Sequence, residues 1–411
     1  MSADEIRGVK TRRLRLEGLG FLLLIVTLAM PGAASTARDD WQEIERIIAI
    51  GDVHGDYDNF LAVLKDAEVI NRRGKWVAGE AHVVQVGDLP DRGPDTLKII
   101  RFLQKLEKQA VKAGGRLHLL IGNHEHMNIT GDLRYVHPGE YNAFKTRNSP
   151  QIRDNYYAFV SEGLSRQRSE LTERGEDTSH LPIVDDAFKK QWYAEHPLGF
   201  VEHRLAWQPG GEIFEWVAAH NTVIRINRTL FLHGGLSAEL IPMTLSDIND
   251  QIRAELRREP YEGAPLGSAD FGPLWYRGLA RGDEIAEAAN LRAVLEHFDA
   301  DSIVLGHTPD LNVITPRFGG RVVIIDVGIS EHYGGHRGSL LIENDSMVAR
   351  HNQELQRLPT LGSDAREYFE ALAKKLPANA RLDAYIEAQT AAEIDSTKAQ
   401  ENATQPVISG E

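Results

Sequence analysis

Five short motifs in the sequence carry side chains that can bind metal ions and phosphate. In chain order they read Gly51-Asp52-Val53-His54-Gly55, Gly87-Asp88-Leu89-Pro90-Asp91-Arg92-Gly93, Gly122-Asn123-His124-Glu125, His233-Gly234-Gly235 and Gly306-His307-Thr308. Carboxylate, amide and imidazole groups are ligands of divalent cations, and the guanidinium fork of arginine matches phosphate oxygens. The chain has no cysteine, so a metal site must use nitrogen and oxygen ligands, and disulfides are excluded.

Each motif also has an ordinary structural explanation. Asp52 and His54 are one residue apart and would point to the same side of an extended strand end, but such a pair is as often a helix cap and a surface residue. A salt bridge in an acidic turn would account for the second motif, and helix capping would account for Asn123. The presence of all five motifs in this order is what favours a metal site.

Expected strands lie directly before the motifs. They are short, largely apolar runs at 46–50, 81–86, 117–121, 229–232 and 302–305. Helical segments are expected after the first two runs, and further runs at 321–326 and 339–342 complete a strand-rich second half. This alternation predicts an α/β or α+β domain, in which the carboxyl ends of the strands converge on the site.

The first residues have the pattern of an export signal. A basic stretch from Lys10 to Arg15 precedes an apolar run from Leu19 to Met30, which predicts a signal peptide over 1–37 with cleavage after Ala37. The run is shorter than the ~20 apolar residues of a membrane span. We therefore expect a periplasmic or secreted protein without stable membrane insertion after cleavage. An N-terminal membrane anchor is the alternative, and Arg12-Arg13 leaves the twin-arginine route open.

The remaining chain is expected to form one catalytic domain over 38–376. A polar, aromatic-rich and largely helical insertion is expected at about 128–215, and 377–411 should hold the end of a last helix and a disordered tail. The formal net charge of −14 argues against nucleic-acid partners, because affinity for the phosphate backbone comes mainly from clustered lysine and arginine.

Taken together, the motifs resemble the signature of the calcineurin-like metallophosphoesterase superfamily and, within it, the phosphoprotein phosphatase branch. The stretches Leu232–Ser237 and Pro273–Gly278, with the enlarged segment after Glu125, are most similar to the bacterial Shewanella-like protein phosphatases. The resemblance covers about residues 45–350. It implies a four-layer fold of two packed mixed β-sheets flanked by helices, with the helical insertion added.

The resemblance also implies a centre of two divalent metal ions. One ion would be bound by Asp52, His54 and Asp88, and the other by Asp88, Asn123, His233 and His307. Manganese is the expected metal, with iron or zinc as alternatives, because the ligands are nitrogen and oxygen. Two such cations can hold a hydroxide for in-line attack on phosphorus.

Further roles carried over by the resemblance concern the substrate. Arg92 and Arg277 would bind the phosphoryl group, and Tyr333 would lie at the rim. His124 would protonate the leaving group as a general acid, with Asp91 orienting its imidazole. Pro90 departs from the family pattern and removes a backbone donor from that loop without removing any expected ligand.

The expected function is metal-dependent hydrolysis of phosphomonoesters on phosphotyrosine, phosphoserine or phosphothreonine proteins or peptides. Small phosphoesters or dinucleoside polyphosphates are the alternative substrates. A binding module without catalysis is disfavoured, because every expected ligand is present. Other histidines are expected to be surface or core residues, namely His126, His203, His220 and His297, whereas His332 and His336 are candidates for the mouth of the site.

Overall fold

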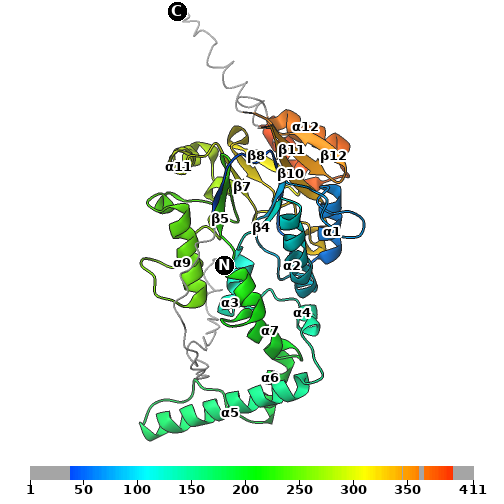
Figure 1. The fold of residues 1–411 in the computed structure, drawn as a ribbon. Helices are drawn as coiled ribbons and strands as arrows, with labels where there is room; N and C mark the ends of the chain where they lie inside the picture. Colours follow the sequence, from blue (N-terminus) through cyan, green and yellow to red (C-terminus); the bar gives the residue numbers. More distant parts are fainter. Residues whose placement is uncertain (1–37, 345, 361–364, 392–411) are drawn as a thin grey trace, which may run out of the picture. The chain divides into compact units, whose positions relative to one another are not determined.

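The structure is a computed structural model that describes residues 38–344, 346–360 and 365–391 (Figure 1). The expected signal peptide therefore lies outside the described residues, as does the expected tail beyond residue 391. A last helix occupies residues 380–391 of the described chain, close to the helix expected there.

Two six-stranded mixed sheets form the core. Sheet one has the order β1 (Asp40–Trp41), β5 (Val223–Ile226), β6 (Thr229–Leu232), β7 (Ser302–Leu305), β9 (Val322–Ile324) and β8 (Thr315–Arg317). Sheet two has the order β12 (Glu354–Arg357), β11 (Ser346–His351), β10 (Gly338–Glu343), β2 (Arg46–Ile50), β3 (His82–Gln85) and β4 (Arg116–Leu119). Strands β2, β3 and β4 are parallel to one another, as are β6, β7 and β9. Their carboxyl ends are therefore available to build a site.

Alternation along the strands divides the apolar side chains between two clusters. Phe231 and Val304 belong to the cluster that also contains the buried residues of sheet two. Their neighbours Leu230 and Leu305 belong to the cluster that contains the apolar faces of α9 and α11. Sheet one is thus buried on both faces, which explains why its strands are almost continuously apolar.

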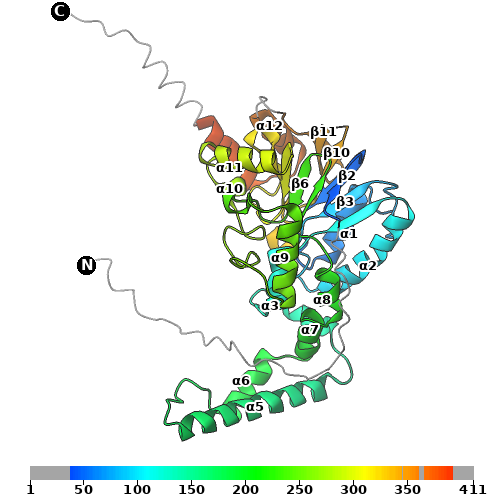
Figure 2. The same ribbon diagram turned by 60° about the vertical axis from the view of Figure 1, so that its left-hand side comes forward.

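Helices cover the outer face of each sheet. Figure 2 shows α1 (Tyr57–Asp66) and α2 (Thr96–Lys112) outside sheet two, and α9 (Leu245–Arg257) and α11 (Glu284–His297) outside sheet one. The prediction of two packed mixed sheets between helices is confirmed.

The chain between α3 and β5 is also largely helical. After α3 (Asn123–Thr130), the described chain forms α4 (Pro138–Ala143), α5 (Ser149–Glu173), α6 (Asp186–Glu195), α7 (Phe200–Trp207) and α8 (Glu212–Val217). In Figures 1 and 2, α5 and α6 lie farther from the sheets than α7 does. Aromatic rings pack these helices together: Trp192 stacks on His196 at 4.0 Å and meets Tyr157 at 5.2 Å between ring centroids. These aromatic residues therefore form the insertion's own small core.

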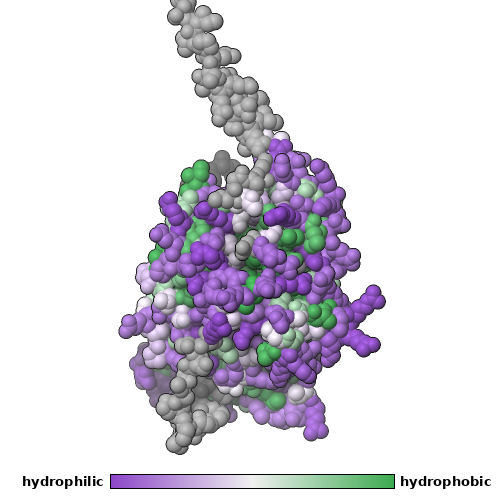
Figure 3. Space-filling view, turned by 45° about the horizontal axis from the view of Figure 1, so that its top comes forward, coloured by the Kyte–Doolittle hydropathy of each residue, from purple (hydrophilic) through white to green (hydrophobic). Residues whose placement is uncertain are grey.

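The surface is mainly polar. On the face drawn in Figure 3, hydrophilic side chains predominate and hydrophobic ones form small separate patches. Large exposed apolar residues such as Val111, Ile183 and Ile285 lie in different parts of the chain. Within the described ranges, no helix combines the length and apolar character that crossing a membrane requires.

Candidate active site

The site lies where the carboxyl ends of parallel strands from both sheets meet. Each strand is followed within four residues by a polar side chain of the site. Sheet two contributes Asp52 after β2, Asp88 after β3 and Asn123 after β4, while sheet one contributes His233 after β6, His307 after β7 and Asp326 after β9. All of these side chains are buried. The convergence follows from the strand order, since residues far apart in sequence end neighbouring strands.

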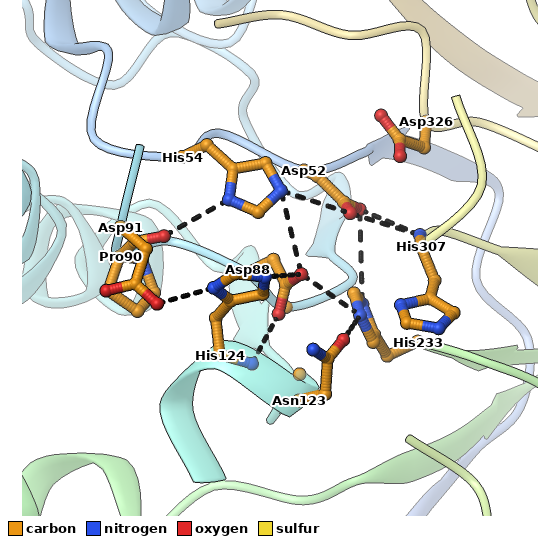
Figure 4. A network of polar contacts seen from close by, with 12 residues as sticks. Asp52, His54, Asp88, Pro90, Asp91, Asn123, His124, His233, His307 and Asp326 are labelled. Atoms are coloured by element: carbon orange, nitrogen blue, oxygen red, sulfur yellow. Dashed lines mark hydrogen bonds and ion pairs between the residues drawn. The ribbon is translucent and has the colours of Figure 1, made fainter. Parts of the chain in front are cut away.

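Asp88 occupies the centre of this group (Figure 4). Its Oδ2 lies 3.3 Å from Nε2 of His233, 3.7 Å from Nε2 of His54 and 3.8 Å from Nε2 of His124. Its Oδ1 accepts a hydrogen bond of 2.9 Å from the backbone N–H of His124. The carboxylate therefore contacts side chains from both sheets.

Backbone carbonyls orient two of these imidazoles. Nδ1 of His54 lies 3.2 Å from the carbonyl oxygen of Pro90, and Nδ1 of His233 lies 3.0 Å from that of Val86. A carbonyl accepts only, so each Nδ1 carries a proton and donates it, which directs Nε2 of each ring toward the carboxylate of Asp88. Backbone carbonyls orient metal-binding histidines in the same way.

This convergence of nitrogen and oxygen atoms is the feature that fits a metal ion. Nε2 of His233 lies 3.3 Å from Oδ2 of Asp88 and 2.8 Å from Oδ1 of Asn123, so one cation could bind all three atoms. Nε2 of His307 is buried and has no hydrogen-bond partner in the described part of the chain. A bound cation would give Nε2 of His307 a partner, and the mixed nitrogen and oxygen donors suit divalent transition metals.

Two groups of ligand atoms are compact enough to hold an ion each. One consists of Asp88, His233 and His307, and the other of Asp88, His54 and His124, with the ligand atoms of each group within 4.8 Å of one another. The first matches the expected ligand set apart from Asn123, which contacts His233. The second contains His124 where the sequence suggested Asp52, whose Oδ2 lies 3.8 Å from Nε2 of His54.

The electrostatics of the group also favour bound cations. Burial, and then the neighbouring carboxylates of Asp326 and Asp88, raise the pKa of Asp52 well above its usual value. Burial lowers the pKa of His54 to about 3 and holds that of His307 well below its ordinary value, so both imidazoles are neutral at physiological pH, as metal ligands must be. Bound cations would offset the repulsion among the buried carboxylates.

The loops that carry the site are strained and tightly packed. Positive φ angles occur at His54 (47°), Asp88 (57°), Asp91 (73°), Arg92 (66°) and His307 (67°). Such conformations cost roughly 1–3 kcal/mol each for residues other than glycine, and they concentrate at functional sites. At Gly306 a Cβ atom would lie 2.5 Å from Oδ1 of Asp52, so only glycine permits this approach.

His124 and Asp91 form the contact that acid catalysis would need. Nδ1 of His124 lies 2.5 Å from Oδ2 of Asp91, and Asn128 donates to Oδ1 of Asp91 at 2.9 Å. Burial opposes the charged imidazole, but the Asp88 charge and the hydrogen bond to Asp91 outweigh it and raise the pKa of His124 above its ordinary value. The imidazole is thus suited to carry a proton next to the cavity.

A cavity of about 110 Å³ opens above these groups. Its lining includes the expected phosphate-binding residues Arg92, Arg277 and Tyr333. The guanidinium group of Arg92 lies 3.8 Å from the ring centroid of Tyr135, and Arg277 donates to the carbonyl oxygen of His307 at 2.7 Å. The structure therefore brings all the sequence-predicted residues to one place, with His233 and Asp91 just beneath the cavity wall.

Several residues of the site were not predicted from the sequence. Asp326 and Trp275 line the cavity, as does Tyr135. Asp326 follows strand β9 as Asp88 follows β3, so the strand-end rule could have identified it. Glu125 belongs to a predicted motif, but its role was missed: its carboxylate accepts from the backbone N–H groups of Asp88, Leu89 and Gly122 at 2.7–2.9 Å. It thereby joins the second and third motif loops.

The other histidines lie outside the cavity lining. His126 is buried beside Gly267, and His203 is fully buried in the insertion. His297 is exposed, with its ring bonded to the carbonyl oxygen of Met243. Neither His332 nor His336 lines the cavity, although His332 is close enough to Arg92 for that charge, after burial, to lower the pKa of its imidazole.

Glu140 in helix α4 is a further buried acid beside the site. Its Oε1 accepts from the backbone N–H of Asp91 at 2.9 Å and from the hydroxyl of Thr96. Its Oε2 lies 3.6 Å from Nε2 of His203. Burial, and then the charge of Asp91, raise the pKa of Glu140 to about 8.

Comparison with known proteins gives consistent matches. The sequence model of a family described as calcineurin-like phosphoesterase matches residues 45–311. An uncharacterized protein of Schizosaccharomyces pombe is 33% identical over 317 residues, which span 74% of this chain and 79% of that protein. Shewanella-like protein phosphatase 2 of Arabidopsis thaliana is 31% identical over 301 residues, spanning 71% of this chain and 73% of that one.

A solved structure is similar over most of the fold. The cold-active protein-tyrosine phosphatase of a psychrophilic Shewanella species is 29% identical to this chain, with a TM-score of 0.57. The match covers 78% of this chain and 82% of that one.

The buried carboxyl of Glu140 should make stability depend on pH. Its pKa of about 8 exceeds the ordinary value of 4.5, so the folded state keeps a proton that the unfolded state loses between these two values. This contribution to stability is complete below about pH 4.5 and is lost as pH rises toward 8, with a slope of at most about 1.4 kcal/mol per pH unit. Glu140→Gln should therefore gain stability relative to wild type as pH rises from 5 to 8.

Urea unfolding of both proteins at pH 5, 6.5 and 8 measures this difference. The groups facing Glu140 are Asp91, His137 and His203, and they are unchanged in the variant. A difference in unfolding free energy that stays constant across this range would show that Glu140 is ionised throughout.

Proposed function

We propose that this chain, which belongs to the calcineurin-like phosphoesterase family and hydrolyses phosphoester bonds, acts on phosphorylated proteins. It would remove their phosphate groups at a centre of two divalent metal ions. The observation that carries the proposal is the convergence of buried imidazole nitrogens on Asp88 beneath a cavity lined by two arginines. A site that recognises only phosphate would not require this cluster of imidazole and carboxylate ligands.

Each group of the site has a part in the proposed reaction. Asp52, His54, Asp88, Asn123, His233 and His307 would hold the ions, and Asp326 is a further carboxylate within their reach. When bound, two such cations neutralise phosphoryl oxygens and supply a nucleophile at neutral pH. Arg92 and Arg277 orient the phosphoryl group with charged donors, and the effect is strongest where charge spreads over its oxygens.

Proton transfer to the leaving group falls to His124. His124 lines the cavity, its Nδ1 is bound to Asp91 and its Nε2 lies 3.8 Å from Oδ2 of Asp88, so the ring is fixed and its protonated form is stabilised. An alkoxide leaving group such as serine depends strongly on this proton, whereas p-nitrophenolate leaves with little help.

The size of the cavity supports a substrate whose phosphoryl group enters alone. About 110 Å³ is well below the roughly 300 Å³ or more of pockets that enclose a whole small ligand. The aromatic rings of Tyr135, Trp275 and Tyr333 line this space. The rest of the substrate would lie outside it, as a protein chain does. The names of the Arabidopsis and Shewanella relatives agree with a protein substrate.

Manganese is the metal that we propose, on the basis of the nitrogen and oxygen donors. Export to the periplasm, or secretion, is a further proposal, based on the basic and apolar pattern of residues 10–30. If the leader is cleaved as proposed, mass analysis of the protein from a periplasmic extract should find Arg38 at the N-terminus. Cytoplasmic protein that retains residues 1–37 would contradict this.

Activity of the manganese-loaded mature protein should be measured on a phosphotyrosine peptide, a phosphoserine peptide and a dinucleoside tetraphosphate. We expect both peptides to be hydrolysed, the phosphotyrosine peptide faster, and the dinucleotide at least about tenfold more slowly. Asp88→Asn should lower activity by about a thousandfold or more, because both ligand groups share Asp88.

His297→Asn provides the control, since His297 is exposed, does not line the cavity and contacts the carbonyl oxygen of Met243. Unchanged activity of Asp88→Asn would refute the metal centre. A dinucleotide that is the best substrate of the three would refute the protein substrate.

The acid role of His124 predicts a dependence on the leaving group. His124→Gln should lower kcat for the phosphoserine peptide about a hundredfold or more and that for p-nitrophenyl phosphate about tenfold or less. His126→Gln is a matched control, because His126 lies in the same helix and is buried without reaching the cavity. Equal losses on both substrates would exclude the acid role.

A further inference from the structure

A chain of buried polar contacts extends from the proposed acid into the helical insertion. His124 contacts the side chain of Asp91, and the backbone N–H of Asp91 donates to Oε1 of Glu140 at 2.9 Å. The hydroxyl of Thr96 donates to the same oxygen. Glu140 therefore holds the main chain of the residue that orients His124, rather than the imidazole itself.

The main chain at this point needs to be held. Asp91 and Arg92 both have positive φ angles, and neither is glycine. The backbone N–H of Asp91 is bonded to Glu140, and that of Arg92 donates to the carbonyl oxygen of Tyr135 at 3.0 Å. Both acceptors lie in the short segment that enters the insertion. A strained conformation persists only where its surroundings impose it, and here the segment 135–140 imposes it.

Helix α7 supports this segment from the other side. His203 places Nε2 at 3.6 Å from Oε2 of Glu140, and the next residue, Arg204, donates to the carbonyl oxygen of Asn128. Asn128 in turn donates to Oδ1 of Asp91 at 2.9 Å. Two consecutive residues of α7 thus reach Asp91 by separate routes, one through its backbone and one through its carboxylate.

The contact between Glu140 and His203 is not one that is expected to stabilise the fold. Oε2 of Glu140 and both ring nitrogens of His203 have no hydrogen-bond partner within the described residues, and both side chains are almost completely buried. The rings of Tyr141 and Phe144 lie 5.2 Å and 5.1 Å from that of His203, an environment suited to an apolar side chain. Buried polar groups with incomplete hydrogen bonding usually destabilise a fold, so their presence beside Asp91 points to function.

We propose that Glu140, supported by His203 of the insertion, is a positioning residue that holds Asp91 in its strained conformation and so sets the orientation of the proton donor His124. The proposal rests on the proposed function, because it assigns Glu140 to the acid step of that reaction. The insertion then contributes to the acid step of the proposed reaction through Glu140 and His203.

Glu107 and His220 provide a matched control pair. They lie 3.6 Å apart, the same separation as Glu140 and His203, and Glu107 also accepts from Trp216 at 3.0 Å. Glu107 belongs to α2, and among the described residues neither member of the pair contacts a motif residue. The variant Glu107→Met therefore shows how the loss of a Glu–His contact outside the site affects activity.

The test compares kcat and KM for a phosphoserine peptide and p-nitrophenyl phosphate in five proteins: wild type, Glu140→Met, Glu140→Gln, His203→Phe and Glu107→Met. Glu140→Met removes the acceptor for the backbone of Asp91, and we expect kcat for phosphoserine to fall about tenfold or more with p-nitrophenyl phosphate changed less than about threefold. Glu140→Gln keeps an acceptor oxygen and should recover most of the loss. His203→Phe should give a smaller loss, about threefold, with the same substrate dependence.

KM should stay within about twofold throughout, since the phosphate-binding arginines are untouched. Glu107→Met should affect neither substrate. Equal losses on both substrates in Glu140→Met, or full activity of both Glu140→Met and His203→Phe, would overturn the proposal. If Glu140→Met fails to fold, the result for His203→Phe decides whether the proposal stands, because a phenyl ring is suited to the space beside the rings of Tyr141 and Phe144.

Measuring His124→Gln in parallel distinguishes a failure of the acid role of His124 from a failure of the positioning role of Glu140. If His124→Gln loses activity on phosphoserine selectively and the Glu140 and His203 variants do not, the acid role stands and the positioning role fails. If His124→Gln itself shows no selectivity, the proposed acid step fails.

Discussion

The buried carboxylate of Asp88 is the interaction on which the rest of the site depends. It lies at the end of β3 in sheet two and approaches Nε2 of His233 from sheet one at 3.3 Å. Burial opposes the charge of Asp88, but the nearby imidazoles of His233, His124 and His54 outweigh it and hold the pKa of this carboxyl well below its usual value. Glu125 fixes the backbone of Asp88 and of the neighbouring motif, and the backbone N–H of His124 donates to Oδ1 of Asp88, so the carboxylate is held in this central position. The fold thus gathers a carboxylate and imidazole nitrogens from both sheets at one point, an arrangement that divalent cations can bind.

The same constraint explains where the strain is located. Positive φ angles occur at Asp88, His54 and His307, residues whose side chains must point inward from the ends of three different strands. A strand end that continued in extended conformation would alternate its side chains and carry some of them away from the centre. Left-handed turns reverse the chain immediately after the strand and keep these side chains together. The energy stored in the turns is offset by the two hydrophobic clusters that pack the strands below them.

Much of the fold and of the site could be predicted from sequence because the signals are local. The runs at 229–232 and 302–305 coincide with β6 and β7, and each of the five motifs begins just after a strand. The predicted strand at 321–326 is shorter in the structure, with β9 at Val322–Ile324, and Asp326 was counted as part of a strand instead of as a side chain of the site. The edge strands β1, β8 and β12 were not anticipated, since short strands at sheet edges carry little periodicity of their own, and neither was β11, which pairs between β12 and β10.

Contacts formed across the insertion could not be predicted in the same way. His203 was taken for an ordinary surface or core histidine, and its burial in the structure agrees with a core position, but no sequence pattern relates it to Glu140, 63 residues earlier. Their proximity depends on how α7 packs against α4, which tertiary contacts decide. An insertion in this position therefore has two physical effects. It contributes its own aromatic core, and it adds hydrogen-bond acceptors for a loop whose strained backbone the two sheets alone do not satisfy.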